Sequence, residues 1–492
     1  MAPITADLCE WISALQLSDV PEDVIARTKY LILDGVACAI IGSHLPWSEI
    51  GTQAVLTMES PGKCSIWGWE KVWLHRYYSY ISSLTIQQQV GPLAAALLNS
   101  SFIQAFELDD YHAESPIHSS SVILPALFAL VQHHNPAMTD SQFLLAAVVG
   151  YEIGPRIGLG LWGGDILSRG WHSGAVFGPA AAAAAVSKAM GLNAKQIEEA
   201  VGIACSQACG LMSAQYGSMV KRMQHGFAAR NGLFSALMVS NAYTGICSVL
   251  ETPYGGFIST FGSGGTRDPP TTPERITEGL GRSWELQKIN VKPYASMAAT
   301  HGTIDCIRIV QEQYPDALQD ISAIEEIVVE MSEPAFKKGG WTPVRPVEST
   351  SAQMSAAFAA ACQIVDRNVL VEQFTPTSVD RDEIWSWVGK FRIEQKLEYG
   401  KDKQTMWFQQ MTITFRDSTR DKVRVFVPAP RGVKPLLTNE EIVSKWRSLT
   451  QNVLEDGKRN QIEDCVLNLG KGTRLSELVE LLGAQTKPLA DF

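Results

Sequence analysis

The sequence predicts a mainly α protein, in which a large all-helical domain is joined to a smaller α+β domain. Three observations lead to this fold class. Residues 1–260 contain one helical pattern after another. A cluster of glycines and prolines interrupts the chain at residues 261–273, and alternation of apolar and polar residues follows it. With 492 residues, 46% of them hydrophobic and 19% charged, the chain is long enough for about two to four domains.

Helices in the first region are predicted from their end signals and from their apolar content. Thr5 offers a capping start, and Pro21 opens a second helix. An alanine-rich helix is expected over 180–190, starting after a Gly-Pro pair and stopping before a glycine. Residues 91–98 and 143–149 are apolar on most faces, so we expect them in helices buried at the centre of the domain.

The second region combines strands with helices. Residues 324–331 alternate in polarity, and 411–415 and 422–427 do so on either side of a polar loop, which predicts a strand and a hairpin. A helix is expected over 353–365 between these strands. From Thr438 onward the sequence returns to a helical pattern with an acidic first turn, so we expect this tail to pack back on the first domain.

These patterns divide the chain into a helical domain at 1–268, an α+β domain at 269–435 and C-terminal helices at 436–492. Residues 72–89 are rich in aromatic residues and serine and interrupt the helical pattern on both sides. The segment is 18 codons long, and its end residues are compatible with splice-site codons, so one hypothesis is a translated intron. The alternative is an ordinary surface insertion. Sequencing the transcript distinguishes them, because a message that always retains these codons excludes the intron.

Charge and composition restrict the class of partner. The chain has 41 Lys and Arg against 51 Asp and Glu, a net charge of −10, which argues against nucleic acid as a partner. An anionic ligand would therefore need a local cationic pocket. We see neither an apolar run of membrane-spanning length nor a secretory signal, and the nine cysteines are scattered, so we expect a cytoplasmic protein that is not inserted in a membrane.

Histidine clusters point to the chemistry, because imidazole exchanges protons near neutral pH. The first cluster runs from Glu107 through Asp109 and His112 to His118, on a predicted loop between two apolar helices. Loops mounted on rigid elements often carry active sites. A metal site formed by Asp109, Asp110, His112 and His118 is conceivable, but the spacing matches no strong metal signature, and helix capping is the plainer interpretation.

Three further clusters supply histidines and cations. His172 lies between Gly170 and Gly174, just before the alanine-rich helix, and the N-terminus of that helix could favour an anion. Lys221 and His225 are four residues apart and would share one face of a helix. The last cluster contains Lys292, Tyr294 and His301. No nucleophile elbow or phosphate loop accompanies them, and the pattern favours proton transfer or elimination on a small polycarboxylate, with neither a metal nor a cofactor.

At these clusters the chain resembles the MmgE/PrpD family, and within it the fungal decarboxylases that convert cis-aconitate to itaconate. The resemblance covers nearly the whole chain except 72–89 and is carried by motifs such as Gly170-Trp-His-Ser-Gly and Val220-Lys-Arg-Met-Gln-His-Gly. It implies a helical domain with an α+β lid, a homodimer, a site between the domains and no cofactor. The matching stretches are 30–35, 102–112, 170–176, 207–217 and 220–232.

The resemblance implies that His118, His172, Lys221 and Lys292 are catalytic. The loop acids are less certain, because the 107–118 stretch is one residue longer than in the animal itaconate-forming enzymes. The expected activity is decarboxylation of cis-aconitate or of an alkyl-substituted analogue. The alternatives are a 2-methylcitrate dehydratase-like hydro-lyase and a non-catalytic binding protein. Residues expected to bind the substrate are Asp109, His112, His225, Tyr294 and His301.

Overall fold

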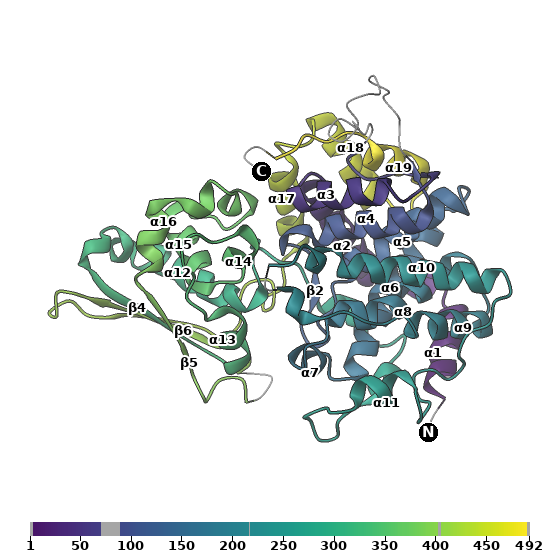
Figure 1. The fold of residues 1–492 in the computed structure, drawn as a ribbon, viewed down its shortest axis with the longest axis horizontal. Coiled ribbons are helices and arrows are strands. Elements are labelled where there is room, and N and C mark those ends of the chain that lie inside the picture. Colours follow the sequence, from purple (N-terminus) through teal and green to yellow (C-terminus); the bar gives the residue numbers. More distant parts are fainter. Residues whose placement is uncertain (1–2, 70–88, 216, 402–404, 490–492) are drawn as a thin grey trace.

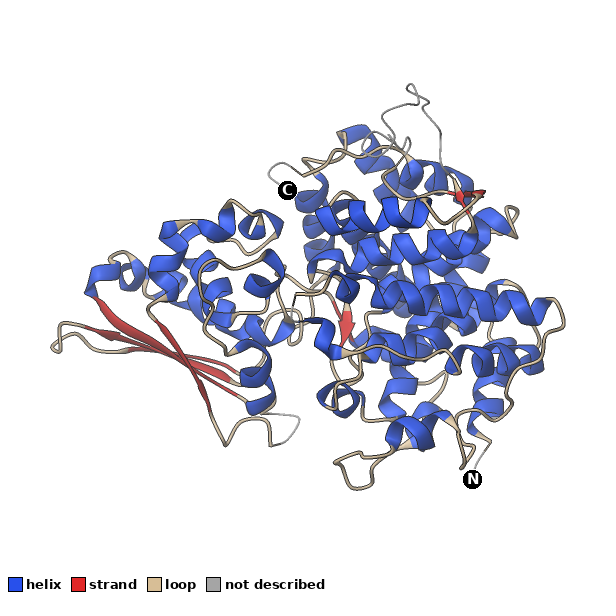
Figure 2. Cartoon of the chain, viewed as in Figure 1, coloured by secondary structure: helices blue, strands red, loops and turns tan. Residues whose placement is uncertain are grey.

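The computed structural model describes residues 3–69, 89–215, 217–401 and 405–489. Except for Gln89, the segment 72–89 lies outside the described residues. The chain forms two lobes (Figure 1). The larger lobe consists almost entirely of helices, and the smaller lobe carries a twisted sheet with helices packed on one face (Figure 2). The predicted fold class, mainly α with a smaller α+β domain, is confirmed.

Helices that are apolar around most of their circumference form the centre of the larger lobe. Helix α8 (Ser173–Ala189) packs against α5, α6, α9 and α10, and nearly all its side chains are buried. The apolar runs at 91–98 and 143–149 lie within buried α4 and α6, as expected. The surrounding helices are α1 (Ile4–Ala14), α2 (Glu22–Gly42), α3 (Pro46–Leu56), α4 (Pro92–Ile103), α5 (Ser119–His133), α6 (Asp140–Gly160), α7 (Gly163–Ser168), α9 (Ala194–Cys205), α10 (Gln224–Ser240) and α11 (Phe257–Gly262).

Among the described residues one helix, α6, is long and apolar enough to cross a membrane by length and composition alone. In the structure, 94% of its apolar window is buried inside the larger lobe. Packing against neighbouring helices therefore accounts for its apolar character.

Helix α8 begins seven residues before the alanine-rich helix predicted at 180–190, so the expected start was wrong. Its first residue is Ser173, and Pro179 lies inside the helix. A proline within a helix lacks the N–H that would bond the carbonyl four residues earlier, here Ala175. The backbone N–H of Cys209 donates to that carbonyl instead, at 3.3 Å. A neighbouring segment thus satisfies the carbonyl that the proline leaves free, and the helix continues.

The smaller lobe is built on a four-stranded sheet with strand order β5-β4-β6-β7. The pair β4–β5 is parallel, and the pairs β4–β6 and β6–β7 are antiparallel. The predicted strand at 324–331 and the predicted hairpin are confirmed. The strands are β4 (Ile324–Met331), β5 (Phe391–Gln395), β6 (Gln409–Phe415) and β7 (Val423–Val427); the helices are α12 (His301–Gln313), α13 (Glu333–Gly339), α14 (Ser349–Gln353), α15 (Ala356–Asp366) and α16 (Asp382–Val388).

The helix expected over 353–365 is divided in two. Helix α14 ends at Gln353, and α15 begins at Ala356. Ser355 lies between them, and its hydroxyl accepts a hydrogen bond from the Phe358 backbone N–H, which caps the second helix. Gln353 consequently stands at a break between helices, where its side chain reaches the carbonyls of Phe106 and Ala295.

The chain leaves the larger lobe after a short antiparallel ladder. Strand β3 (Ile289–Asn290) pairs with β2 (Tyr111–His112) of the larger lobe. The glycines and prolines at 261–273 led us to expect the end of the helical domain at residue 268. The turns at 273–276 and 285–288 also pack on α6 of the larger lobe. Lys292 therefore follows directly on a strand anchored in the helical lobe.

The C-terminal helices lie on the larger lobe (Figure 1). Helices α17 (Asn439–Thr450) and α18 (Asp456–Leu467) pack on α2, and α19 (Leu475–Gly483) contacts α5. Thr438 caps α17 in a capping box with Glu441, as its sequence suggests. From α17, Lys445 reaches inward to the buried carboxylate of Asp34 at 2.6 Å and to the carbonyl of Leu108 at 2.8 Å.

Candidate active site

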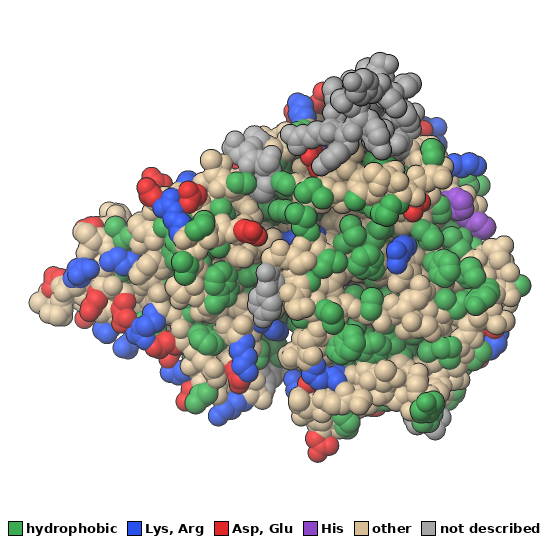
Figure 3. Space-filling model, in the orientation of Figure 1, with side chains coloured by type: hydrophobic (Ala, Val, Ile, Leu, Met, Phe, Trp, Pro, Cys, Tyr) green, Lys and Arg blue, Asp and Glu red, His purple; other side chains and the backbone are tan. Residues whose placement is uncertain are grey.

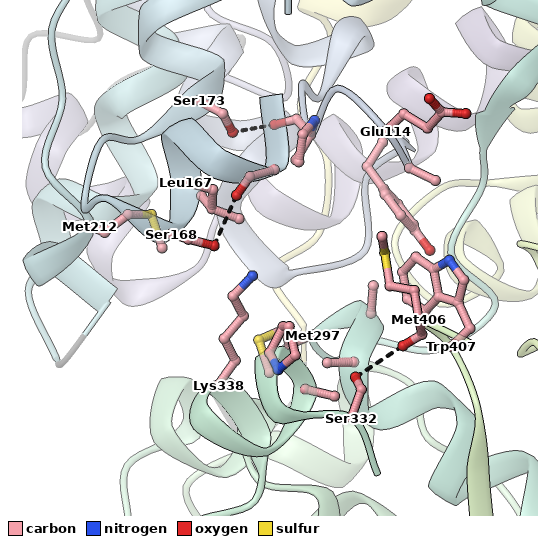
Figure 4. Close-up of a pocket in the computed structure, with 18 of the residues that line it drawn as sticks. Glu114, Leu167, Ser168, Ser173, Met212, Met297, Ser332, Lys338, Met406 and Trp407 are labelled. Atoms are coloured by element: carbon pink, nitrogen blue, oxygen red, sulfur yellow. Dashed lines mark hydrogen bonds between the residues drawn. The ribbon is translucent and has the colours of Figure 1, made fainter. Parts of the chain in front are cut away.

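A cavity of about 340 Å³ lies between the two lobes. The larger lobe contributes side chains from α7 and from the start of α8, and the smaller lobe contributes α13 and the segments around 297–299 and 406–409 (Figure 4). The structure brings the four residues expected to be catalytic into this one cavity. All of them line its wall: His118, His172, Lys221 and Lys292.

Glu107 organises the positive charge of the cavity. It adopts a left-handed conformation, φ 55°, which costs a residue other than glycine roughly 1 kcal/mol. Its buried carboxylate contacts the ammonium group of Lys221, the guanidinium of Arg222 at 3.0 Å and the ammonium of Lys292 at 3.2 Å. Burial by itself would raise the pKa of Glu107, but the three cations outweigh it and hold that pKa well below its usual range. The carboxylate therefore stays ionised between the cations.

Lys221 is a cation whose protonation responds to this environment. Burial lowers the pKa of its ammonium group to about 8, although Glu107 opposes the shift. Lys221 sits in a short 3₁₀ turn (Met219–Met223), whereas His225 lies in the following helix α10. The two residues were expected on one face of a single regular helix, and that expectation was wrong because the backbone changes geometry between them.

Three histidine rings lie in contact beside this charge cluster, at tilted and edge-on angles. The ring centroids of His118 and His225 are 4.9 Å apart, and those of His172 and His225 are also 4.9 Å apart. His225 does not line the cavity, and its Nδ1 shares a 2.8 Å hydrogen bond with the hydroxyl of Ser121. The close approach depends on Gly174, because a Cβ there would come within 2.2 Å of the His225 ring nitrogen.

The three imidazoles have different surroundings. Burial lowers the pKa of His172 to about 3 and that of His225 well below its ordinary value, so both are neutral near pH 7. His118 instead faces a buried carboxylate, with its Nδ1 3.1 Å from Asp109. Burial would raise the pKa of Asp109, but the charge and hydrogen bond of His118 lower it overall. Asp109, expected to bind the substrate, does not line the cavity, and it contacts His118, which does.

His112, expected to bind the substrate, points away from the cavity. Its Nε2 is 3.1 Å from the carboxylate of Glu285, and its Nδ1 accepts the backbone N–H of Ser115 at 3.0 Å. Both ring nitrogens therefore hold the loop in place. Neighbouring Asp110 accepts hydrogen bonds from Ser120. Of the four residues of the conceivable metal site, Asp109 and His118 contact each other, whereas Asp110 and His112 turn to other partners.

Tyr294 and His301 also lie behind the cavity wall. The Tyr294 hydroxyl donates to Asp305 at 2.5 Å, and its ring makes an edge contact with His301 at 5.2 Å between centroids. His301 Nε2 is 3.0 Å from the Ser296 carbonyl, and burial lowers the His301 pKa to about 3. These two residues support the segment that carries Lys292.

Sequence reasoning missed Arg222 and Gln353 beside the cavity and Lys338 in its wall. Arg222 contacts Glu107. It follows Lys221 in the Val220-Lys-Arg-Met-Gln-His-Gly motif, so this motif was a signal that could have identified it. Gln353 is different, because no local pattern marks it. From the smaller lobe its amide donates to the carbonyls of Phe106 and Ala295, both at 2.8 Å, and its oxygen accepts from Arg222 at 3.0 Å. It thereby ties the segments bearing Glu107 and Lys292 together.

Comparisons with known proteins also divide the chain into two parts. Residues 6–77 and 79–268 match the MmgE/PrpD N-terminal domain, and 294–471 match the MmgE/PrpD C-terminal domain. The chain is therefore a member of the MmgE/PrpD family. It is 44% identical to the cis-aconitate decarboxylase-like protein oryM of Aspergillus oryzae, over 98% of each chain.

Two further relatives carry a decarboxylase name. The chain is 42% identical to the cis-aconitate decarboxylase of Aspergillus terreus, over 98% of this chain and 96% of the relative. It is 24% identical to the human cis-aconitate decarboxylase, over 99% of this chain and 95% of the relative.

Proposed function

We propose that this protein is a carbon–carbon lyase that decarboxylates cis-aconitate, or a closely related alkyl-substituted tricarboxylate, to itaconate or its analogue. The observation that carries the proposal is the meeting, in one cavity, of the cations around Glu107 with the His118–Asp109 pair. The decarboxylase names of the relatives support it and do not favour the hydro-lyase alternative.

The reaction explains why such a cavity is needed. The bond to the carboxylate on the methylene arm breaks, CO₂ leaves, and the electron pair enters an allylic system. The charge moves to the far carbon, where the adjacent carboxylate accepts it as an enolate. Protonation of that carbon shifts the double bond and completes the product. The protein must therefore stabilise the enolate and deliver one proton, and no redox or group-transfer step is involved.

The residues divide these tasks by charge. Lys221 and Lys292 hold carboxylates and stabilise the enolate, because positive charge is most effective where negative charge develops. His118 delivers the proton, since its ring lines the cavity and its Nδ1 lies 3.1 Å from the carboxylate of Asp109. His172, neutral near pH 7, donates a hydrogen bond from the N-terminus of α8.

The apolar part of the wall favours the alkyl-substituted substrate as a second candidate. Cis-aconitate offers little apolar surface beyond one methylene and one vinyl carbon. The cavity, at about 340 Å³, is of the size that binds drug-like ligands. An alkyl group would bury apolar wall that a bare tricarboxylate leaves uncovered. That wall is formed by Leu167, Met212, Met297, Met354, Met406 and Trp407.

We also propose a cytoplasmic homodimer. Of the 14 large hydrophobic side chains that are exposed in the described part of the chain, seven fall between residues 211 and 254. Hydrophobic side chains gather on one face of the larger lobe (Figure 3). Exposed apolar surface of this kind is typical of subunit interfaces. The seven are Leu211, Met219, Val220, Phe234, Tyr243, Ile246 and Tyr254.

A CO₂-release assay with identification of the product by NMR tests the function. The purified protein is incubated with cis-aconitate and, separately, with an alkyl-substituted aconitate. Release of CO₂ with an itaconate-type product is expected. Hydration without CO₂ would support the hydro-lyase, and binding without turnover would support the non-catalytic alternative. The ratio of kcat/KM for the two substrates identifies the preferred one.

A further inference from the structure

We propose that Lys338, on the smaller lobe, binds a carboxylate that the substrate retains through the reaction. This inference rests on the proposed function, because it concerns how a tricarboxylate is held in the same cavity. It adds a third cationic contact, from the opposite lobe, to those supplied by Lys221 and Lys292.

Lys338 faces the cavity from helix α13 (Glu333–Gly339). Its ammonium group extends from the smaller lobe toward Ser168 and Leu167 of the larger lobe (Figure 4). The adjacent Lys337 projects outward instead, 69% exposed and paired with Glu333. Two consecutive lysines of one helix therefore have opposite environments, and only Lys338 is directed at the cavity.

Lys338 has no carboxylate partner within 4.0 Å among the residues that the structure describes. Burial lowers the pKa of its ammonium group, and no nearby charge opposes the shift. Lys221, Arg222 and Lys292 differ in this respect, since they share the carboxylate of Glu107. A half-buried cation without a counter-ion is unfavourable until an anion arrives, and it can then form a charge-assisted hydrogen bond.

The chemistry indicates which carboxylate Lys338 holds. A cation bound to the departing carboxylate would stabilise the ground state and slow the loss of CO₂. A cation bound to the central carboxylate, which neither leaves nor becomes the enolate, contributes about equally to the ground state and the transition state. Loss of Lys338 is therefore expected to raise KM and to leave kcat nearly unchanged. Glutarate lacks this central carboxylate, whereas tricarballylate has it.

The experiment compares Lys338→Met with Lys337→Met. Calorimetry measures the binding of tricarballylate, a tricarboxylate, and of glutarate, a dicarboxylate, and a CO₂ assay gives kcat and KM for cis-aconitate. In Lys338→Met we expect tricarballylate affinity to fall, and KM to rise, about tenfold or more, with kcat changed less than about threefold. Glutarate affinity should be unchanged, which also shows that the variant is folded. Lys337→Met should match the unaltered protein, and Lys338→Arg should recover part of the lost affinity.

The outcomes separate the two proposals. If tricarballylate binding depends on Lys338 but cis-aconitate yields no CO₂, the proposed function fails and the carboxylate contact stands. If CO₂ is released but tricarballylate binds Lys338→Met as tightly as the unaltered protein, the contact is wrong. A fall in kcat at constant KM, or no tricarballylate binding by the unaltered protein, also overturns the inference.

Discussion

Glu107 compensates part of the positive charge at one end of the cavity. Lys221, Arg222 and Lys292 carry three charges when protonated, and one carboxylate compensates only one of them. The remainder suits a multiply charged anion, although the whole chain carries a net charge of −10. Local pairing, not overall charge, therefore decides which ligand the cavity accepts.

The first prediction concerns Lys221 and pH. Because its pKa is lowered to about 8, the protonated fraction falls as pH rises through that value, and with it the cation that binds carboxylate. We expect kcat/KM for cis-aconitate to decline above about pH 8. In Lys221→Arg the guanidinium stays charged, so the decline should disappear or move to higher pH. A pH profile of Lys221→Arg identical to that of the unaltered enzyme would assign the decline to another group.

The second prediction concerns the two cavity histidines. His118→Ala removes the proposed proton donor, and His172→Ala removes a neutral hydrogen-bond donor at the start of α8. Each should lower turnover at least about tenfold, or 1.4 kcal/mol of barrier. His133→Ala, at the exposed end of α5, is the control and should retain full turnover. Unchanged turnover in both cavity variants would remove these assignments.

At the scale of elements, α17 connects the C-terminus of the chain to the active-site loop. Lys445 crosses from α17 to Asp34 on α2, and it also donates to the Leu108 carbonyl beside Glu107. Asp34 is fully buried, so its carboxylate depends on this partner. Helix α17 therefore supports the position of Glu107 although it contributes nothing to the cavity wall.

The third prediction tests this connection. Lys445→Met should lower the free energy of unfolding by about 3–5 kcal/mol, because it leaves a buried carboxylate without its cation. Urea unfolding followed by circular dichroism measures the change. Arg447, also on α17, pairs with Glu463 of α18, and its side chain is 59% exposed, so Arg447→Met should have a smaller effect. Equal losses in the two variants would show that the buried pair has no special role.

Elements differ in how far sequence alone could predict them. Strand β4 and the β6–β7 hairpin follow from local alternation, because one face of each strand is buried. The start of α8 does not follow locally, since Pro179 is tolerated only because Cys209 satisfies the freed carbonyl. The break between α14 and α15 likewise does not reveal the role of Gln353, because the carbonyls that its side chain contacts belong to segments distant in sequence.

At the scale of the molecule, the apolar face of the larger lobe should be a subunit interface. The fourth prediction is that the unaltered protein sediments at twice the mass of the chain, and that Tyr243→Glu combined with Ile246→Glu shifts it toward the monomer. Both side chains are about half exposed, and a buried carboxylate at an interface is costly. Leu397→Glu, 71% exposed on the smaller lobe, is the control and should leave the dimer intact. Analytical ultracentrifugation measures the masses, and a monomeric unaltered protein would contradict the prediction.

The sequence by itself determined the family, the two-domain fold class and the segments that carry the histidines and lysines, because these depend on local patterns and motifs. Only the tertiary structure decided that Glu107, 114 residues from Lys221, lies against it. It also decided that His112, Tyr294 and His301 support the wall from behind, whereas His118 faces both Asp109 and the cavity. The physical reason is that charge pairing and burial, which set each protonation state, arise between segments distant in sequence.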